Sequence, residues 1–347
     1  MRAAVLTGWR KPLEISEVPD PSCPPDGVVL EVLACGVCRS DWHAWVGSDP
    51  DIELPHILGH EFCGRVIDTG PAVGRWQVGD QAVAPFILAC GHCPDCQAGH
   101  QTICATQIVP GFTAPGAFAA RIAVPRADVN LARLPASMDP ALAAGLGCRV
   151  TTAWHALTGR AALQPGEWLA VWGTGGVGLS AMLLGRALGA RVAVVDVVGE
   201  KLDHAQDLGA DAAIDASHGD AVAHLRQVTG GGAHLAIEAL GTLETTRNAL
   251  LSLRKLGRMV QVGMPAGDHV TMPLPMDAVY SGQLAIYGTR GMPAWRYPSL
   301  FSLIEGGHVD LSPLISRRIA LSQATDELAA FDAPAPPGVA VITDFEG

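Results

Sequence analysis

The sequence predicts a two-domain chain, in which a mainly-β domain accompanies an α/β domain built on a doubly wound parallel sheet. At 347 residues the chain exceeds the usual size of one compact domain. Residues 1–150 carry short β-type runs separated by Gly- and Pro-rich turns. From Glu167 onward, strand-like and helix-like patterns alternate. Such alternation is typical of βα units that build a parallel sheet with helices on both faces.

The expected elements follow this division. In the first domain they are short strands, at Val28–Leu33, Cys63–Asp68, Gln81–Pro85 and Phe118–Val124. In the second domain the expected strands are Trp168–Trp172, Arg191–Val197, Ala212–Asp215, His234–Leu240, Arg258–Val262 and Leu284–Tyr287. The helices expected between them include Gly176–Leu188, Glu200–Leu208 and Leu243–Leu256. The alternation stops after Thr289, and the tail Met292–Gly347, with a loop at Pro334–Gly338, is expected to return to the first domain.

Composition narrows the class of protein. The formal net charge is −11 and no Lys/Arg-rich run occurs, which argues against a nucleic-acid partner. The N-terminus lacks the pattern of a signal peptide, and no apolar run approaches the length of a membrane span. We therefore expect a cytoplasmic protein without a membrane partner.

The nine cysteines indicate metal binding rather than disulfides, because their number is odd and no secretion signal precedes them. Four of them, Cys90, Cys93, Cys96 and Cys104, lie within fifteen residues on a turn-rich segment. Four closely spaced thiolates suit tetrahedral zinc, and four protein ligands leave no open position for a substrate. This segment is therefore predicted to hold a structural zinc.

A second motif predicts dinucleotide binding. Gly173, Gly175 and Gly178 have G-x-G-x-x-G spacing after a predicted strand and at the start of a predicted helix, and the next strand ends in Asp196. The glycines permit a tight turn, close approach to a pyrophosphate and packing of helix on strand. The carboxylate suits the ribose hydroxyls of NAD and would repel the 2′-phosphate of NADP. The alternative interpretation is that these glycines serve only to pack the helix on the strand.

A catalytic zinc would need about three protein ligands and one open position. The candidates are Cys23, Cys35, Cys38, Cys63 and Cys148, together with His60 and Glu61 in the run LPHILGHEFCGRV. Spacing alone does not choose among these cysteines.

The ordered motifs GVCRSDWH, GHE, the four-cysteine segment, GCRVTTAW and GTGGVG with its aspartate run nearly end to end along the chain. On these motifs the chain resembles the zinc-dependent alcohol dehydrogenases of the medium-chain dehydrogenase/reductase family. The resemblance implies a GroES-like catalytic domain with two zinc sites over residues 1–150 and 289–347, and a Rossmann NAD-binding domain over residues 151–288. It also implies a zinc that activates the alcohol as a Lewis acid and a hydride transfer from the alcohol carbon to NAD.

The same resemblance assigns roles to single residues. The ligands of the catalytic zinc are Cys38, His60 and Cys148. Glu61 lies beside the metal, and Asp41 orients His60. The remaining cysteines are expected to be buried filling.

Ser40 and His43 form the proton relay, and Thr152 packs on the nicotinamide. Residues expected to contact the cofactor, in addition to the three glycines, are Arg39, Gly176, Val177, Asp196 and Lys201. For His43 a purely structural role, and for Arg39 and Asp41 a role as surface side chains, stay open as alternatives.

One departure from the family pattern stands out: Ala340 takes the position of a basic residue that in many relatives reaches the cofactor phosphates. Phe86, Trp42, Trp45 and Trp154 are candidate pocket residues, although bulky side chains are usually core. They favour apolar or aromatic, primary or secondary alcohols. A polyol or amino-alcohol dehydrogenase is the alternative, followed by a non-catalytic relative or a zinc-free quinone reductase. By analogy we expect a homotetramer, with a dimer as the alternative.

Overall fold

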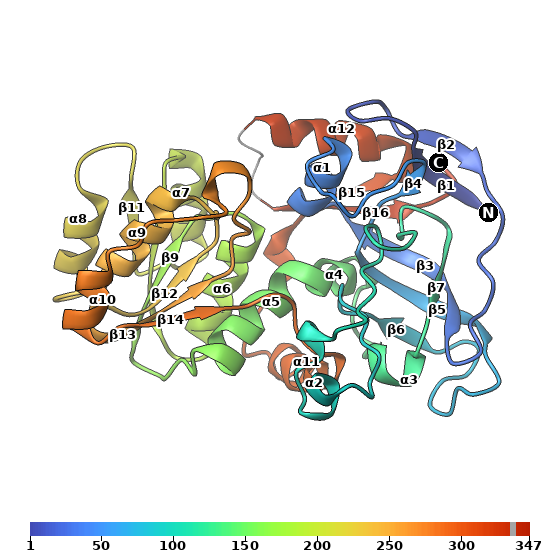
Figure 1. The fold of residues 1–347 in the computed structure, drawn as a ribbon, viewed down its shortest axis with the longest axis horizontal. Helices are drawn as coiled ribbons and strands as arrows, with labels where there is room; N and C mark the ends of the chain where they lie inside the picture. Colours follow the sequence, from blue (N-terminus) through green and yellow to red (C-terminus); the bar gives the residue numbers. More distant parts are fainter. Residues whose placement is uncertain (334–337) are drawn as a thin grey trace. The chain divides into compact units, whose positions relative to one another are not determined.

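The computed structural model describes residues 1–333 and 338–347, so the loop expected at Pro334–Gly338 lies outside the described residues except for its last glycine. The chain divides into two compact units (Figure 1). Unit 1 comprises Met1–Thr151, Gly291–Leu303 and Ser312–Gly347, and unit 2 comprises Thr152–Arg290 and Ile304–Leu311. The short segment 304–311, which the sequence interpretation placed with the first domain, thus groups with unit 2.

Unit 1 is a mainly-β domain with two sheets. Its larger sheet has the strand order β15-β16-β3-β5-β6-β8, with β7 also paired to β3, and its smaller sheet has the order β2-β1-β4. The strands are β1 Arg2–Leu6, β2 Glu14–Glu17, β3 Val28–Gly36, β4 His56–Ile57, β5 Glu61–Thr69, β6 Gln81–Val83, β7 Arg121–Val124, β8 Ala132–Arg133, β15 Ile315–Ala320 and β16 Val339–Asp344. The helices are α1 Arg39–Trp45, α2 Pro94–Gln97, α3 Ala127–Asn130, α4 Pro140–Gly145 and α12 Ala324–Ala329, and α11 Tyr297–Glu305 spans the division between the units.

The β3–β5 pair carries the core of unit 1 and positions the candidate site. The two strands run antiparallel, with Ala34 opposite Cys63 and Gly36 opposite Glu61. Both strands bury apolar side chains, including Leu30 and Phe62, in one large hydrophobic cluster. Burial of this kind stabilises the pairing by about 1.5–3 kcal/mol for each large apolar side chain. The end of β3 and the start of β5 are therefore held side by side.

Unit 2 is a Rossmann-type parallel sheet with the strand order β11-β10-β9-β12-β13-β14. The strands are β9 Trp168–Trp172, β10 Arg191–Asp196, β11 Ala212–Asp215, β12 Ala233–Glu238, β13 Leu253–Gln261 and β14 Ala285–Gly288. The helices are α5 Thr151–Trp154, which begins on the last residue of unit 1, α6 Gly176–Ala187, α7 Gly199–Asp207, α8 Ala221–Val228, α9 Leu243–Leu251 and α10 Met276–Gly282. The order reverses between β9 and β12, which makes the carboxyl ends of these two strands the topological switch point.

One expected helix boundary is wrong. The run Leu243–Leu256 was expected to be a single helix, but α9 ends at Leu251 and β13 begins at Leu253. The leucines of this run have a helix-like spacing, yet Leu253 pairs in parallel with Ala233 of β12. Pairing with a neighbouring strand overrides the local propensity of the segment.

Further findings bear on the expectations from composition. All nine cysteines lie in the described part of the chain and are free thiols. Cys35 and Cys63 are fully buried, whereas Cys23 is half-buried. Within residues 1–333 and 338–347, no helix has the length and apolar character needed to cross a membrane.

Candidate functional site

Four potential metal ligands from three separate segments of unit 1 meet near the end of β3. Cys38, His60, Glu61 and Cys148 each offer one ligand atom, and these atoms all lie within 4.8 Å of one another. Cys38 caps the N-terminus of α1, while Glu61 begins β5 and His60 directly precedes it. Cys148 lies in a wide helical turn, Leu146–Val150, that continues α4. The fold thus brings together residues that are up to 110 positions apart in the sequence.

Asp41 ties two of these segments together. Its carboxylate is fully buried and accepts hydrogen bonds from the backbone N–H of Cys38 at 2.8 Å and of Gly59 at 3.2 Å. The same carboxylate lies 2.9 Å from Nδ1 of His60. In the neutral imidazole, which is the form that binds a metal, a carboxylate at Nδ1 keeps the proton on that nitrogen and leaves the lone pair on Nε2. Nε2 of His60 is buried and has no hydrogen-bond partner among the described residues.

The donor set fits zinc. Two thiols and one imidazole nitrogen with a free lone pair make a Cys₂His site, which leaves a fourth position open. Hydrogen bonding with Cys148 lowers the pKa of Cys38 well below that of a free thiol, against the opposing effect of burial, and the charge of Arg149 lowers it further. Thiolates bind metals, so this environment favours the ligating form.

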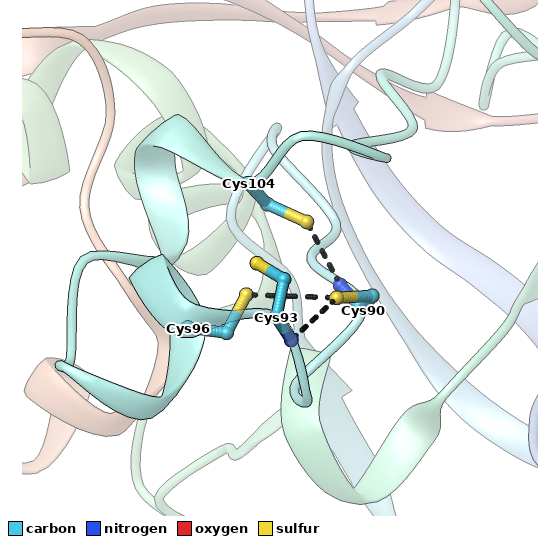
Figure 2. A group of neighbouring side chains, drawn as sticks. All are labelled: Cys90, Cys93, Cys96 and Cys104. Atoms are coloured by element: carbon cyan, nitrogen blue, oxygen red, sulfur yellow. Dashed lines mark hydrogen bonds between the residues drawn. The ribbon is translucent and has the colours of Figure 1, made fainter.

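A second cluster joins the other four cysteines. Figure 2 shows the side chains of Cys90, Cys93, Cys96 and Cys104 converging on one point, and their sulfur atoms lie within 4.8 Å of one another. The backbone N–H of Cys93 is directed at the sulfur of Cys90 at 3.3 Å, and the N–H of Cys90 at the sulfur of Cys104 at 3.2 Å. Hydrogen bonds from backbone N–H groups, that of His92 above all and then that of Cys93, lower the pKa of Cys90 to about 5. Four sulfur ligands suit a closed zinc site.

The glycine turn after β9 has the geometry that a dinucleotide needs. Gly173 has a φ of +96°, in the left-handed region that glycine adopts without strain. A Cβ on Gly178 would lie 1.8 Å from the carbonyl oxygen of Gly173, so any side chain there would break the packing of α6 on β9. A Cβ on Gly175, by contrast, would meet no atom within 4 Å. The turn is therefore open where a phosphate would approach, beside the first backbone amides of α6 at Gly176 and Val177.

Asp196 ends β10 and is held firmly next to this turn. One carboxylate oxygen accepts hydrogen bonds from both the N–H and the hydroxyl of Thr174 at 2.7 Å. The other accepts from the N–H groups of Val197 and Val198 at 2.8 and 3.1 Å. Lys201 lies in the first turn of α7, which starts three residues after Asp196. These contacts fix the position of the negative charge that a nucleotide ribose would meet.

Comparison with known proteins identifies the family. The description "Alcohol dehydrogenase GroES-like domain" matches residues 24–136, and "Zinc-binding dehydrogenase" matches residues 176–306. An alcohol dehydrogenase of Geobacillus stearothermophilus is 37% identical over 296 residues, which is 84% of this chain and 85% of that protein. The chain belongs to the zinc-dependent medium-chain alcohol dehydrogenases.

Two further similarities extend over the whole length. An L-threonine 3-dehydrogenase of Streptomyces coelicolor is 32% identical over 99% of both chains. The solved structure of the alcohol dehydrogenase TADH from Thermus sp. ATN1 has a TM-score of 0.91 at 30% identity, and the match covers 99% of this chain and 100% of that one. The zinc and nicotinamide cofactors of this family fit the two cysteine clusters and the glycine turn of this chain.

In this alcohol dehydrogenase the expected relay residues lie near the candidate zinc ligands. The hydroxyl of Ser40 lies 3.9 Å from the sulfur of Cys38. His43 is half-buried on α1, with Nδ1 3.3 Å from the hydroxyl of Ser48. Among the described residues, Ser40 and His43 share no hydrogen bond. A relay between them would therefore need a bridging group.

The aromatic candidates separate into different environments. Trp45 is buried in the core, with its indole N–H donating to the carbonyl of Lys11 at 2.7 Å. Trp154 is buried on α5. Phe86 is buried with its ring centroid 5.9 Å from that of His60, and Phe112 packs edge-on at 5.3 Å. Phe112 was missed in the sequence, where nothing marked it as a neighbour of the ligand histidine.

Trp42 and Arg39 form a surface stack. The guanidinium of Arg39 lies 4.6 Å from the centroid of Trp42, and that of Arg10 lies 5.9 Å from it. The indole N–H of Trp42 donates to Asp332 at 2.9 Å, and Arg39 donates to the carbonyl of Phe331 at 2.9 Å. The ring of Trp42 and the carbonyl of Phe331 thus hold the side chain of Arg39, the candidate cofactor residue.

Arg149 is the charged residue of the site that sequence reasoning missed. Its Nε donates to Glu61 at 3.1 Å and its Nη2 donates to the carbonyl of Val37 at 2.8 Å. The N–H of Val37 in turn donates to the carbonyl of Ala340 at 2.9 Å. The only signal in the sequence was the position of Arg149 directly after the predicted ligand Cys148. Its contacts with Glu61 and Val37 come from the fold.

Proposed function

We propose that the chain is an NAD(H)-linked zinc alcohol dehydrogenase that interconverts apolar or aromatic alcohols, primary or secondary, with their aldehydes or ketones. The observation that carries this proposal is the apolar surroundings of the ligand cluster. The rings of Phe86 and Phe112 pack against His60, one of the proposed zinc ligands. An apolar wall next to the metal favours apolar substrate groups over polyols.

Each polar residue of the site has a proposed task. Cys38, His60 and Cys148 would hold a zinc, which would supply Lewis acidity toward the alcohol oxygen. Asp41 holds His60 in the tautomer that directs Nε2 toward the metal. Glu61, beside these ligands, has one oxygen held by Arg149 and one buried oxygen without a hydrogen-bond partner among the described residues.

Proton release is proposed to pass from the hydroxyl of Ser40 to the imidazole of His43. Because these two groups do not contact each other directly, the transfer would need a bridging hydroxyl or water. Burial, together with the charge of Arg39, lowers the pKa of His43. A lowered pKa keeps the imidazole neutral, and able to accept a proton, over the neutral pH range.

We propose NAD rather than NADP as the cofactor, bound by the glycine turn with Gly176 and Val177, and by Asp196, Lys201 and Arg39. Asp196 places a fixed negative charge where the ribose would lie. A 2′-phosphate would meet like charge there. Thr152 is proposed to contact the nicotinamide.

A polyol or amino-alcohol dehydrogenase is the second candidate. The similarity that favours it is the L-threonine 3-dehydrogenase of Streptomyces coelicolor, which matches over 99% of both chains. It differs from the first candidate in requiring polar groups to recognise the substrate.

A substrate panel tests the two candidates. Purified enzyme would be assayed with NAD⁺ and NADP⁺ against benzyl alcohol, a primary and a secondary aliphatic alcohol, sorbitol and L-threonine. We expect kcat/KM to be highest for an apolar or aromatic alcohol with NAD⁺. Highest kcat/KM for sorbitol or L-threonine would reject the first candidate, and a preference for NADP⁺ would reject the role of Asp196.

We further propose that unit 1 is the catalytic domain with both zinc sites, that unit 2 is the NAD-binding domain, and that the enzyme is a cytoplasmic homotetramer. Unit 2 has apolar side chains available for subunit contacts: Tyr280 is 87% exposed, and Val270 and Met276 are also exposed. The edge strand β14 pairs only with β13 among the described strands. Light scattering coupled to size exclusion would distinguish tetramer, dimer and monomer.

A further inference from the structure

A buried carboxylate ends the central strand β12 of unit 2. Glu238 is the last residue of this strand and is fully buried. One of its oxygens accepts hydrogen bonds from the N–H groups of Leu240 and Gly241, both at 2.9 Å, and from the hydroxyl of Thr245 at 2.7 Å. The other accepts from the N–H of Gly241 at 3.0 Å and from the side-chain amide of Gln261. No sequence motif drew attention to this residue.

Glu238 also joins the loop after β12 to the loop after β13. Its backbone carbonyl accepts from the N–H groups of Val262 and Gly263, both at 2.9 Å. The side-chain amide of Gln261 donates to the carbonyl of Gly263 at 2.9 Å. A Cβ on Gly263 would lie 2.2 Å from the backbone nitrogen of Gly241. The two loops are thus in close backbone contact, with Glu238 between them.

The third loop at this edge is the glycine turn. Trp172, the last residue of β9, is the parallel partner of Glu238, and its carbonyl accepts the N–H of Ala239 at 3.0 Å. The glycine turn starts at the next residue. A Cβ on Gly173 would lie 2.7 Å from Cγ of Leu240, so this leucine rests directly on the turn.

The network around Glu238 lies at the topological switch point of the sheet. In open α/β sheets a ligand binds beyond the carboxyl ends of the strands, at the point where the strand order reverses. Here that point lies between β9 and β12, the strands that end in Trp172 and Glu238. The buried carboxylate therefore organises the loops that frame the expected dinucleotide crevice.

The network requires a side chain that accepts hydrogen bonds at both of its terminal atoms. All the groups that face the side chain of Glu238 donate hydrogen bonds, and an ionised carboxylate is acceptor-only. A glutamine of the same shape would turn its NH₂ group toward one of these donors. A loop would then have to move, or a buried donor would lose its partner.

We propose that Glu238 is a positioning residue of the dinucleotide site, which holds loops 239–242 and 262–264, and through Leu240 the glycine turn, in the geometry that accepts NAD(H). This inference rests on the proposed binding of NAD(H) by unit 2. Glu238 acts through the loops and does not touch the reacting atoms.

The test compares Glu238→Gln with Glu244→Gln, which removes an equal charge from an exposed position in α9. NADH affinity would be measured by fluorescence titration, alongside zinc content, melting temperature, and KM for NAD⁺ and for the alcohol. Because one mismatched buried partner costs on the order of a factor of ten, we expect Glu238→Gln to weaken NADH binding about tenfold. The KM for NAD⁺ should rise with it. Zinc content and KM for the alcohol should stay at wild-type values, as should every parameter of Glu244→Gln.

Leu240→Ala provides a second variant that leaves the buried acid in place. Leu240 is 50% exposed, so its truncation should not unfold the protein. We expect NADH binding to weaken about threefold, on the order of one lost apolar contact. If Glu238→Gln fails to fold, Leu240→Ala becomes the deciding variant. NADH affinity of Leu240→Ala equal to that of wild type would then overturn the proposal.

A Glu238→Gln variant that melts earlier but binds NADH like wild type would show a purely structural role and overturn the inference alone. Wild-type protein that fails to bind NADH would overturn the proposed function, and this inference with it.

Discussion

Removal of one partner from the buried ion pair between Arg149 and Glu61 should destabilise unit 1. Its side chains are only 7% and 0% exposed, and Nε of Arg149 lies 3.1 Å from the carboxylate. Burial raises the pKa of Glu61 to about 8, against the lowering effect of Arg149. Arg149→Met keeps the length of the side chain but removes this cation, so Glu61 must either stay buried as an unpaired carboxylate or take up a proton. Breaking a buried pair in this way costs about 3–5 kcal/mol.

The melting temperature provides the assay. For a domain of this size 1 kcal/mol corresponds to roughly 2–4 °C, so Arg149→Met should melt at least ~6 °C below wild type at matched zinc content. The control is Arg65→Met, whose pair with Glu31 at 3.0 Å is 45% and 47% exposed. An exposed pair contributes about 0–1 kcal/mol, so this control should melt close to wild type.

A double-mutant cycle then isolates the pair. In Arg149→Met/Glu61→Gln neither charge remains unpaired, so the loss should be smaller than the sum of the two single losses by at least ~2 kcal/mol. A coupling near zero, or an Arg149→Met variant that melts like Arg65→Met, would refute the reasoning.

Three further outcomes are expected. Metal analysis should give two zinc ions per chain and one in Cys148→Ala, which should lose turnover but still bind NADH; a single zinc in wild type would contradict the two-site assignment. His43→Ala should slow alcohol oxidation most at low pH, where solvent bases are scarce, and an unchanged pH–rate profile would argue for a structural histidine. Burial alone would raise the pKa of Glu167, but hydrogen bonds from Arg258 bring it below 4.5 on balance. This pair therefore stabilises the fold above pH 4.5 and less as the pH falls through the native pKa. The difference in melting temperature between wild type and Glu167→Gln should accordingly shrink as the pH falls below 4.5, and a constant difference would contradict it.

Local patterns predicted most of the fold and the four-cysteine cluster, whereas the candidate ligands Cys38, His60 and Cys148 were assigned only through the family resemblance. The strand Trp168–Trp172 and the glycine turn after it follow from an apolar run, three glycines and the start of α6, all within eleven residues. The four-cysteine cluster is equally local, because its ligands lie on one short segment. The start of β13 at Leu253 could not be predicted from local patterns, because it depends on pairing with Ala233, twenty positions away.

Non-local contacts account for what the sequence left open. Trp42 could not be assigned to core or pocket, because its hydrogen-bond partner Asp332 lies 290 positions away. Arg149 lies directly after a predicted zinc ligand, yet its partners Glu61 and Val37 are 88 and 112 positions distant. Side chains whose environment is assembled from distant segments need the fold itself.

The C-terminal strands have a consequence for synthesis on the ribosome. Strand β16 lies between β15 and β3 in the large sheet of unit 1, with Val341 opposite Gly36 and Ile342 opposite Cys35. The sheet next to Cys38 therefore cannot close until β16, Val339–Asp344, has been translated, long after β3. Most of unit 2 is translated well before then, and domains generally fold as units during synthesis. The nascent chain should thus pass through a stage with a folded unit 2 and an incomplete unit 1, in which the cysteines of both clusters are exposed to metal and oxidant.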